Sequence, residues 1–367
     1  MKKRLFSLLL VSALVFTLSG CGEKSLLRES DPVTLNFWHV YGEQSGSPMD
    51  LLVQEFNRTV GQEKGVRVQV TNLSSASKIG GFLKEAQKGG RDAPEMPDLF
   101  TCHISDATAL GSDNLVDWNA RFTAEELSNF VPGFLADGMT EDGTLLLFPI
   151  SKSTQLLMCN GSGFARSLAQ GHVVVSDLYS NTQVMTGDVL SGLGSSAAIL
   201  YYNDTVTYRD GTQEPMDLHV LPMPKTAGAD ALMTQAGVGL CAYKTTDQKA
   251  EAAALFVRWL TESERNLDFV AQTGYMPVRN GAFDAIENYD KFPEPTESYR
   301  QLYAALKIMQ ENYTPLSEPR FEGYYGKVSQ LYDGLRQMQQ KLPARAAAGE
   351  SIDTLAEETW ALLCAIH

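Results

Sequence analysis

The first part of the chain alternates between two hydrophobic periods. Residues 33 to 40 and 66 to 70 carry an apolar side chain at about every second position, which is typical of half-buried strands. Between these strands, Ser47 and Pro48 fit the N-cap and first turn of a helix. Its apolar face returns every three or four residues, at Met49, Leu52, Val53, Phe56 and Val60.

The same alternation continues with a helix predicted over residues 76 to 88 and a third strand over residues 97 to 102. Strands that alternate with helices are joined by right-handed crossovers and form a parallel sheet. Ligands bind such sheets outside the carboxyl ends of the strands. We therefore expect a site among residues 38 to 43, 74 to 77 and 103 to 106.

The rest of the chain is also mixed α/β. Residues 145 to 150 and 156 to 159 are predicted strands, and a small α/β segment follows to about residue 240. A strongly amphipathic helix is then marked by Ala252, Leu255, Phe256, Trp259 and Leu260. Thr261 and Glu264 predict a capping box for the next helix, which Gly274 would close. The tail is predicted to be helical over residues 328 to 342 and 352 to 366.

The N-terminus has the form of a secretory signal. Lys2, Lys3 and Arg4 precede an apolar run over residues 5 to 18, which is shorter than the about 20 residues of a transmembrane helix. Leu18-Ser19-Gly20-Cys21 resembles the lipobox of bacterial lipoproteins, and this resemblance implies that Cys21 is acylated and becomes the first residue after cleavage. Two acyl chains hold a protein stably on a bilayer. Residues 22 to 31 are predicted to be a flexible leash.

Charge and cysteine content exclude several classes of protein. The 367 residues contain 30 Lys and Arg against 44 Asp and Glu, a net charge of −14, whereas a nucleic-acid binder carries a basic face. Five Cys without a CxxC pair provide neither a disulfide scaffold nor a zinc site, so we expect no metal and no cofactor. The Cys residues that follow apolar runs, at 102, 159 and 241, are predicted to be buried free thiols.

Several stretches, in this order, resemble the extracellular sugar-binding proteins of ABC importers, the family of maltose-binding protein. They are residues 33 to 39 (VTLNFWH), 148 to 157 (FPISKSTQLL), 192 to 197 (GLGSSA), 220 to 224 (VLPMP), 236 to 260 and 274 to 278 (GYMPV). Between Asn160 and Thr186 the chain is shorter than is usual in that family. The resemblance implies a lipid-anchored monomer on the extracytoplasmic face of the cell membrane. Such a protein delivers a carbohydrate to an ABC permease and performs no chemistry.

The family fold is an α/β, two-lobed periplasmic-binding-protein fold of type II, whose lobes close on ligand about a hinge of strand crossings. We assign residues 1 to 20 to the signal peptide and 21 to 32 to the lipidated Cys and linker. Lobe one comprises residues 33 to 148 and 243 to 312, and lobe two comprises residues 149 to 242 and 313 to 367.

Candidate ligand-binding residues follow from the chemistry of sugars. Aromatic rings cover the apolar faces of a sugar, whereas carboxylates and amides bind its hydroxyls. Aromatic candidates are Trp38, Tyr41, Tyr275 and Tyr324, and polar ones are Glu43, Ser74, Asp106, Lys152, Ser153, Gln155, Gly194, Ser195, Ser196 and Gly237. Each has a structural alternative: a core position for Trp38, a solvated charge or helix cap for Asp106, a solvated side chain for Lys152, and a strand-to-helix turn for Gly194 to Ser196.

Three other functions remain open. A polyol phosphate such as glycerol 3-phosphate could replace the sugar, with Lys152 or Arg320 as a basic partner. A sensor or adhesion lipoprotein could share the fold. A serine enzyme that recognises penicillin is suggested by Ser75 to Lys78 (SxxK) and Ser112 to Asn114 (SDN), but Lys225 to Ala227 departs from KTG and follows a loop-like run with two prolines.

Overall fold

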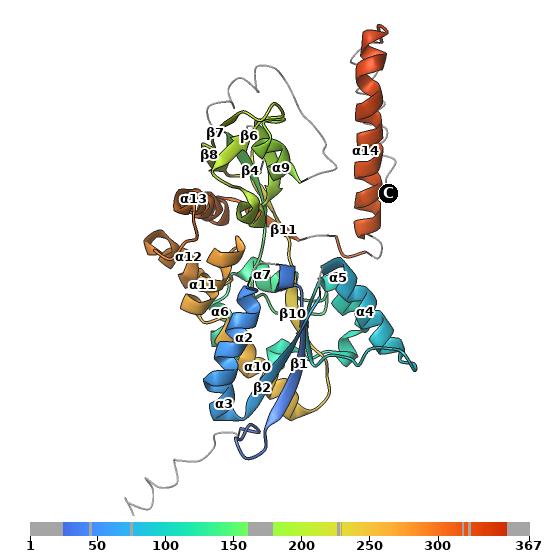
Figure 1. Cartoon of the computed structure of the whole chain (residues 1–367). Helices are drawn as coiled ribbons and strands as arrows, with labels where there is room; N and C mark the ends of the chain where they lie inside the picture. The colour runs from blue at the N-terminus through green and yellow to red at the C-terminus, as the bar shows by residue number, and fades with distance from the viewer. Residues whose placement is uncertain are drawn as a thin grey trace, which may run out of the picture.

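The computed structural model describes residues 25–43, 46–73, 76–160, 179–225, 228, 230–317, 319–321 and 324–350. Two sheets lie at opposite ends of the molecule, and long α14 (Tyr324–Ala347) stands apart from both (Figure 1). Some predictions concern residues outside the described ranges. These are Cys21, Ser74, most of the shortened segment between Asn160 and Thr186, and the predicted helix over residues 352 to 366. No helix within the described ranges is long and apolar enough to cross a membrane.

The lower sheet in Figure 1 contains the predicted parallel strands. β1 (Val33–His39) pairs in parallel with β2 (Val66–Asn72) and with β3 (Leu99–Cys102), which starts two residues later than predicted. β10 (Gly239–Ala242) pairs antiparallel with β3, so the order is β10-β3-β1-β2 and the sheet is mixed. The carboxyl ends of the three parallel strands all face the upper half of the molecule.

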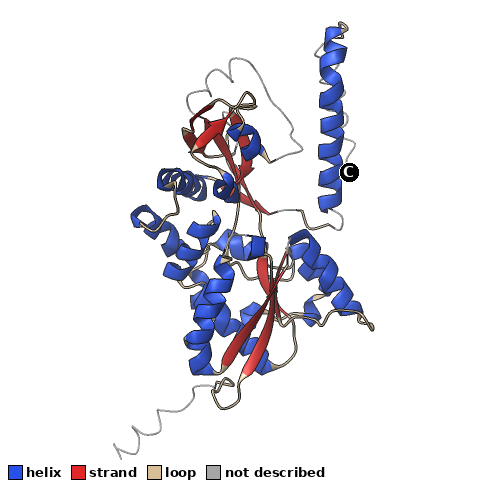
Figure 2. Cartoon of the chain, viewed as in Figure 1, coloured by secondary structure: helices blue, strands red, loops and turns tan. Residues whose placement is uncertain are grey.

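Helices cover both faces of the lower sheet (Figure 2). They are α2 (Pro48–Arg58), α3 (Val60–Lys64), α4 (Ala76–Lys88, as predicted), α5 (Ile104–Leu110), α10 (Asp247–Leu260) and α11 (Ser263–Thr273). The prediction for Ser47 is confirmed, because its Oγ accepts a hydrogen bond from the backbone N–H of Asp50 at 3.3 Å. Phe37 of β1 packs edge-on against Phe256 of α10, with ring centroids 5.8 Å apart.

The upper half is built on a three-stranded antiparallel sheet of order β5-β4-β8. It comprises β4 (Gln155–Asn160), β5 (Ser191–Ser195) and β8 (Leu218–Leu221), with α9 (Ser180–Met185) and the 3-10 helix η4 (Ser196–Tyr201) around it. β6 (Thr205–Thr207) and β7 (Gln213–Pro215) form a hairpin, and β9 (Leu232–Gln235) pairs in parallel with β11 (Thr314–Ser317).

Shorter helical elements lie between these main elements along the chain. They are η1 (Tyr41–Glu43), η2 (Ser112–Asn114), η3 (Trp118–Ala120), α6 (Ala124–Ser128), α7 (Pro132–Asp137), α12 (Asn280–Ala285) and η5 (Ile286–Asn288), followed by α13 (Thr296–Asn312). We predicted α13 for lobe one. Its Gln301 and Met309 instead accept hydrogen bonds from the backbone N–H groups of Val220 and Met223, in the upper half.

Three local predictions are corrected. Residues 145 to 150 are buried but form isolated bridges rather than a strand, because their backbone partners belong to separate segments. Thr261 is the C-cap of α10 rather than the N-cap of α11, and its hydroxyl donates back to the carbonyl of Val257 at 2.8 Å. Glu262 takes the N-cap position of α11. The predicted leash is not free from Ser25 onward, where it lies against α10. Gly274 closes α11 as predicted, in the left-handed conformation.

Candidate functional site

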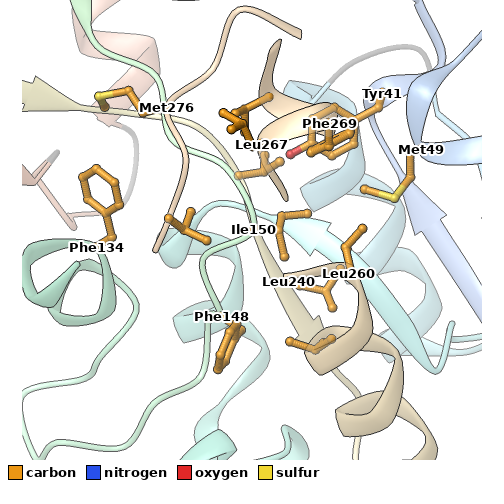
Figure 3. Close-up of a cluster of buried hydrophobic side chains, with 14 of the residues drawn as sticks. Tyr41, Met49, Phe134, Phe148, Ile150, Leu240, Leu260, Leu267, Phe269 and Met276 are labelled. Atoms are coloured by element: carbon orange, nitrogen blue, oxygen red, sulfur yellow. The ribbon is translucent and has the colours of Figure 1, made fainter. Parts of the chain in front are cut away.

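The two halves meet where three chain segments pair with one another. Phe148 and Leu240 exchange backbone hydrogen bonds of 2.8 and 2.9 Å, and Ser153 and Ala236 exchange bonds of 2.9 and 3.0 Å. Lys152 pairs in the same way with Met276, whose N–H donates to the carbonyl of Lys152 at 2.5 Å. We call residues 148–154, 235–240 and 276–278 the crossing. Its apolar side chains belong to one buried cluster with side chains of α2, α7, α10 and α11 (Figure 3).

A buried asparagine ties two segments of the crossing to α11. Asn266 is fully buried, and its side-chain amide donates to the carbonyl of Ile150 at 2.7 Å. The side-chain oxygen of the same residue accepts from the backbone N–H of Val278 at 3.0 Å. Both polar groups of one side chain are therefore satisfied by backbone that would otherwise be unpaired.

Lys152 pairs along its backbone with Met276, but its side chain is not solvated. It is 1% exposed and forms an ion pair with Asp137 at the end of α7. Arg320 donates hydrogen bonds to the backbone carbonyls of Ala136, Asp137 and Met139 at the same helix end. Because its ammonium group is already paired with a carboxylate, Lys152 is part of the crossing rather than a solvated residue or a free ligand donor.

The end of β1 points its side chains alternately into two cores. His39 is fully buried, with its Nε2 2.8 Å from Oδ1 of Asp50, while its Nδ1 accepts from the backbone N–H of Tyr41 at 3.2 Å. These contacts place the proton on Nε2. The hydroxyls of Tyr41 and Ser151 share a hydrogen bond of 2.9 Å, and the ring of Tyr41 packs edge-on against Phe269 and Tyr275. Tyr41 is 4% exposed and so presents no open face for stacking.

The buried imidazole predicts a pH-dependent stability. Burial lowers the pKa of His39 below 6.5, more than its interactions with Asp50 raise it. Below pH 6.5 the unfolded chain binds a proton at His39 that the folded chain does not yet bind. The free energy of unfolding therefore decreases as the pH is lowered from 6.5 to the pKa of His39 in the folded state. Between pH 7.5 and pH 5, the wild type should lose more of its free energy of unfolding than His39→Gln, as measured by urea unfolding. Equal losses in the two proteins would contradict this expectation.

Trp38 and Asp106 lie on the other face of the lower sheet. Trp38 is half-buried and packs against the cluster around Phe100 and Leu147. Asp106 lies in the first turn of α5, and a Cβ added to Gly80 of α4 would collide with its carboxylate. Burial raises the pKa of Asp106, although His103 partly offsets this. Both residues are partly exposed near the carboxyl edge of the sheet, and both also belong to the packing of α4 and α5.

The upper half meets the crossing through the turn between β5 and η4 rather than through the edge of a strand. Gly194 and Ser195 end β5, and the Ser195 hydroxyl caps η4 by accepting from the backbone N–H of Ala197 at 3.3 Å. Ser196 is fully buried, and its N–H donates to the carbonyl of Thr154 at 2.7 Å. The hydroxyls of Ser196 and Thr154 are buried without a hydrogen-bond partner. Two polar side chains at this joint therefore retain hydrogen-bonding capacity.

The structure brings some of the predicted residues to the junction, but not all of them. Tyr41, Lys152, Ser153, Gly237 and Tyr275 lie in the crossing or contact it, and Gly237 takes a φ of +109° beside Ser153. Tyr324 starts α14, where its ring packs against Phe321, and is not part of this cluster. The side chains of Glu43 and Gln155 lie outside the described residues. Sequence reasoning missed Asp137, Asn266 and Gln235, the last of which donates to the Gly133 carbonyl and to the Ser317 hydroxyl.

The described residues hold no group of three or more His, Cys, Asp or Glu that could bind a metal ion. Cys102 and Cys241 are buried free thiols, as predicted, with sulfurs 3.6 Å apart. Burial raises the pKa of Cys102 well above its usual range. A hollow of about 520 Å³ lies elsewhere, between η5 and α13, and is lined by residues that include Phe292, Tyr303 and Lys307. The Lys307 ammonium in this hollow is paired with Glu287 at 2.5 Å.

Residues 164–294 match the bacterial extracellular solute-binding protein family. No curated protein matches the chain.

Solved structures match nearly the whole chain in fold. The cyclic α-maltosyl-1,6-maltose binding protein of Arthrobacter globiformis has a TM-score of 0.62 at 15% identity, covering 91% of this chain and 99% of that one. UgpB of Mycobacterium tuberculosis, solved with glycerophosphocholine, has a TM-score of 0.62 at 16% identity and the same coverage. The GacH receptor of Streptomyces glaucescens, solved with and without acarbose, has a TM-score of 0.61 at 14% identity, covering 90% and 97%. The predicted resemblance and the predicted fold class are confirmed.

Proposed function

We propose that this protein is a receptor that captures a carbohydrate between its two lobes. The chain matches bacterial extracellular solute-binding proteins in sequence and in fold. It hands the carbohydrate to an ABC permease. Cys21 anchors the protein to the extracytoplasmic face of the membrane through its acyl chains. The family consists of receptors rather than enzymes.

The observation that carries this proposal is the crossing. Two sheet-based halves joined by short paired segments can rotate toward one another about a few residues. A ligand held between the halves shifts the population toward the closed state by its greater affinity for that state. The positive φ of Gly237, within the crossing, is a conformation that glycine adopts without strain.

Several residues are assigned to the ligand in this proposal. Trp38 and Tyr275, both partly exposed, would stack on the sugar, and Asp106 and Ser195 would bind its hydroxyls. Glu43, Ser74, Ser153, Gln155, Gly194, Ser196 and Gly237 remain candidates for direct contact. Tyr41 and Lys152 would instead support the hinge.

A polyol phosphate is the second candidate, favoured by the glycerophosphocholine bound to UgpB. A phosphate needs a basic side chain or a helix N-terminus. The two basic residues that we considered for this role have other partners, since Lys152 pairs with Asp137 and Arg320 binds backbone carbonyls. We therefore favour an uncharged sugar.

The serine-enzyme alternative finds no support in the described residues. Lys225 lies outside any strand, whereas a KTG motif belongs on a strand beside the nucleophile. Ser112 to Asn114 form the short 3-10 helix η2, which follows α5 in the sequence.

A thermal-shift screen over mono- and oligosaccharides tests the proposal. A ligand present at 100 times its dissociation constant stabilises the folded state by about 2.7 kcal/mol, which raises the melting temperature by several degrees. We expect this shift for at least one sugar, with none for a non-binding polyol at equal concentration. A shift only with glycerophosphodiesters would support the second candidate. If no sugar or sugar phosphate in a broad panel shifts the melting temperature, the transport function is refuted.

A further inference from the structure

The chain just after the predicted lipid anchor is bound along α10. The Ser25 hydroxyl donates to one carboxylate oxygen of Glu251 at 2.6 Å, and the backbone N–H of Leu26 donates to the other at 3.0 Å. Both oxygens of Glu251 are thus used by a segment 225 residues earlier in the sequence. Leu27, the next residue, packs against the main hydrophobic core.

The following turn is fixed to α3 and α10. The backbone N–H of Asp31 donates to the carbonyl of Arg28 at 3.0 Å, and the side-chain amide of Gln248 donates to the carbonyl of Asp31 at 3.1 Å. Gly65, at the end of α3, has a φ of +68°, and a Cβ there would collide with the carbonyl oxygen of Arg28. This close backbone approach requires glycine.

We propose that residues 25 to 31 form a tether clip, which shortens the link between the lipid anchor and the protein body. A chain spans at most about 3.6 Å per residue. With the clip closed, Cys21 lies within about 14 Å of Ser25; with the clip released, it can lie up to about 43 Å from Val33. The membrane part of this inference rests on the proposed anchorage at Cys21, whereas the clip itself does not.

The clip also determines which end of the protein faces the bilayer. It lies at the amino end of β1, and the crossing lies at the carboxyl end (Figure 1). A strand of this length separates the two by about 20 Å. To turn the junction toward the bilayer, the clipped end must rise by at least that distance. A closed clip forbids this rise and a released clip allows it, so the clip controls whether the junction can turn toward the bilayer.

Hydrogen exchange on the full-length protein tests the clip. We expect the amides of Leu26 and Asp31 to be protected in the wild type. Protection should fall at least tenfold in both Gly65→Ala and Glu251→Ala. Glu251→Ala removes both carboxylate acceptors, and Gly65→Ala places a Cβ against the carbonyl oxygen of Arg28. Gly143→Ala is the matched control, because Gly143 has a φ of +86° with no atom near an added Cβ. Rapid exchange of both amides in the wild type would overturn the clip.

Energy transfer on vesicles tests the orientation. The lipid-anchored protein, labelled at Gln213→Cys in the upper half, is bound to phosphatidylcholine vesicles that contain an acceptor lipid. We expect little transfer in the wild type and in Gly143→Ala, and at least twofold more in Gly65→Ala and Glu251→Ala. Equal transfer in all four proteins would overturn the orientation even if the amides are protected. Failure of the wild type to bind vesicles would refute the anchorage alone, and neither readout depends on sugar binding.

Discussion

Lys152→Ala should lower the free energy of unfolding by about 3–5 kcal/mol, because it leaves the Asp137 carboxylate buried without its partner. The side chains are 1% and 9% exposed, so water cannot replace the lost ammonium group. The three Arg320 hydrogen bonds end on carbonyls of the same helix end and leave the carboxylate unpaired. Urea unfolding monitored by circular dichroism measures the change.

Two further variants separate the cost of an unpaired charge from the value of the pair. Replacing both partners, as Lys152→Met with Asp137→Leu, should recover most of the lost stability, since apolar side chains of similar size often replace a buried pair at little cost. Arg209→Ala removes an exposed pair with Asp188 and should change stability by less than about 1 kcal/mol. A loss for Lys152→Ala as small as that for Arg209→Ala would show that the pair is solvated.

Periodicity was sufficient to predict the framework of the lower sheet. The alternating valines of β2 and the apolar face of α2 are local patterns, and each gave the right element. Residues 145 to 150 misled because a fully buried apolar run has no period of its own. Their partners, Met139 and Leu240, lie on separate segments, so the backbone makes single bridges instead of a ladder.

The site was harder to predict than the fold, because burial depends on distant contacts. Tyr41 lies directly after a strand and Lys152 lies within the hinge, and both are positions where ligand-binding residues are expected. Their polar atoms are nevertheless taken by Ser151 and Asp137, from other parts of the chain. No local pattern distinguishes a lysine that reaches a ligand from one that is paired in the core. Asn266, in the middle of an ordinary amphipathic helix, gives no sequence signal of its role at all.

Asn266 is also where we expect the second large effect. Asn266→Leu keeps the branched shape of the side chain but leaves the carbonyl of Ile150 and the N–H of Val278 without partners in a dry interior. Each unsatisfied buried group costs about 1–3 kcal/mol, so we expect a loss of about 2–5 kcal/mol in the free energy of unfolding.

Asn266→Asp distinguishes the two bonds. Its carboxylate still accepts from Val278 but cannot donate to Ile150, and it adds a buried charge. We therefore expect it to be no more stable than Asn266→Leu at pH 7. Asn312→Ala is the control, because Asn312 donates only within its own exposed helix end, and a change within about 0.5 kcal/mol is expected. If Asn266→Leu is as stable as Asn312→Ala, both backbone groups have other partners, and the asparagine does not join α11 to the crossing.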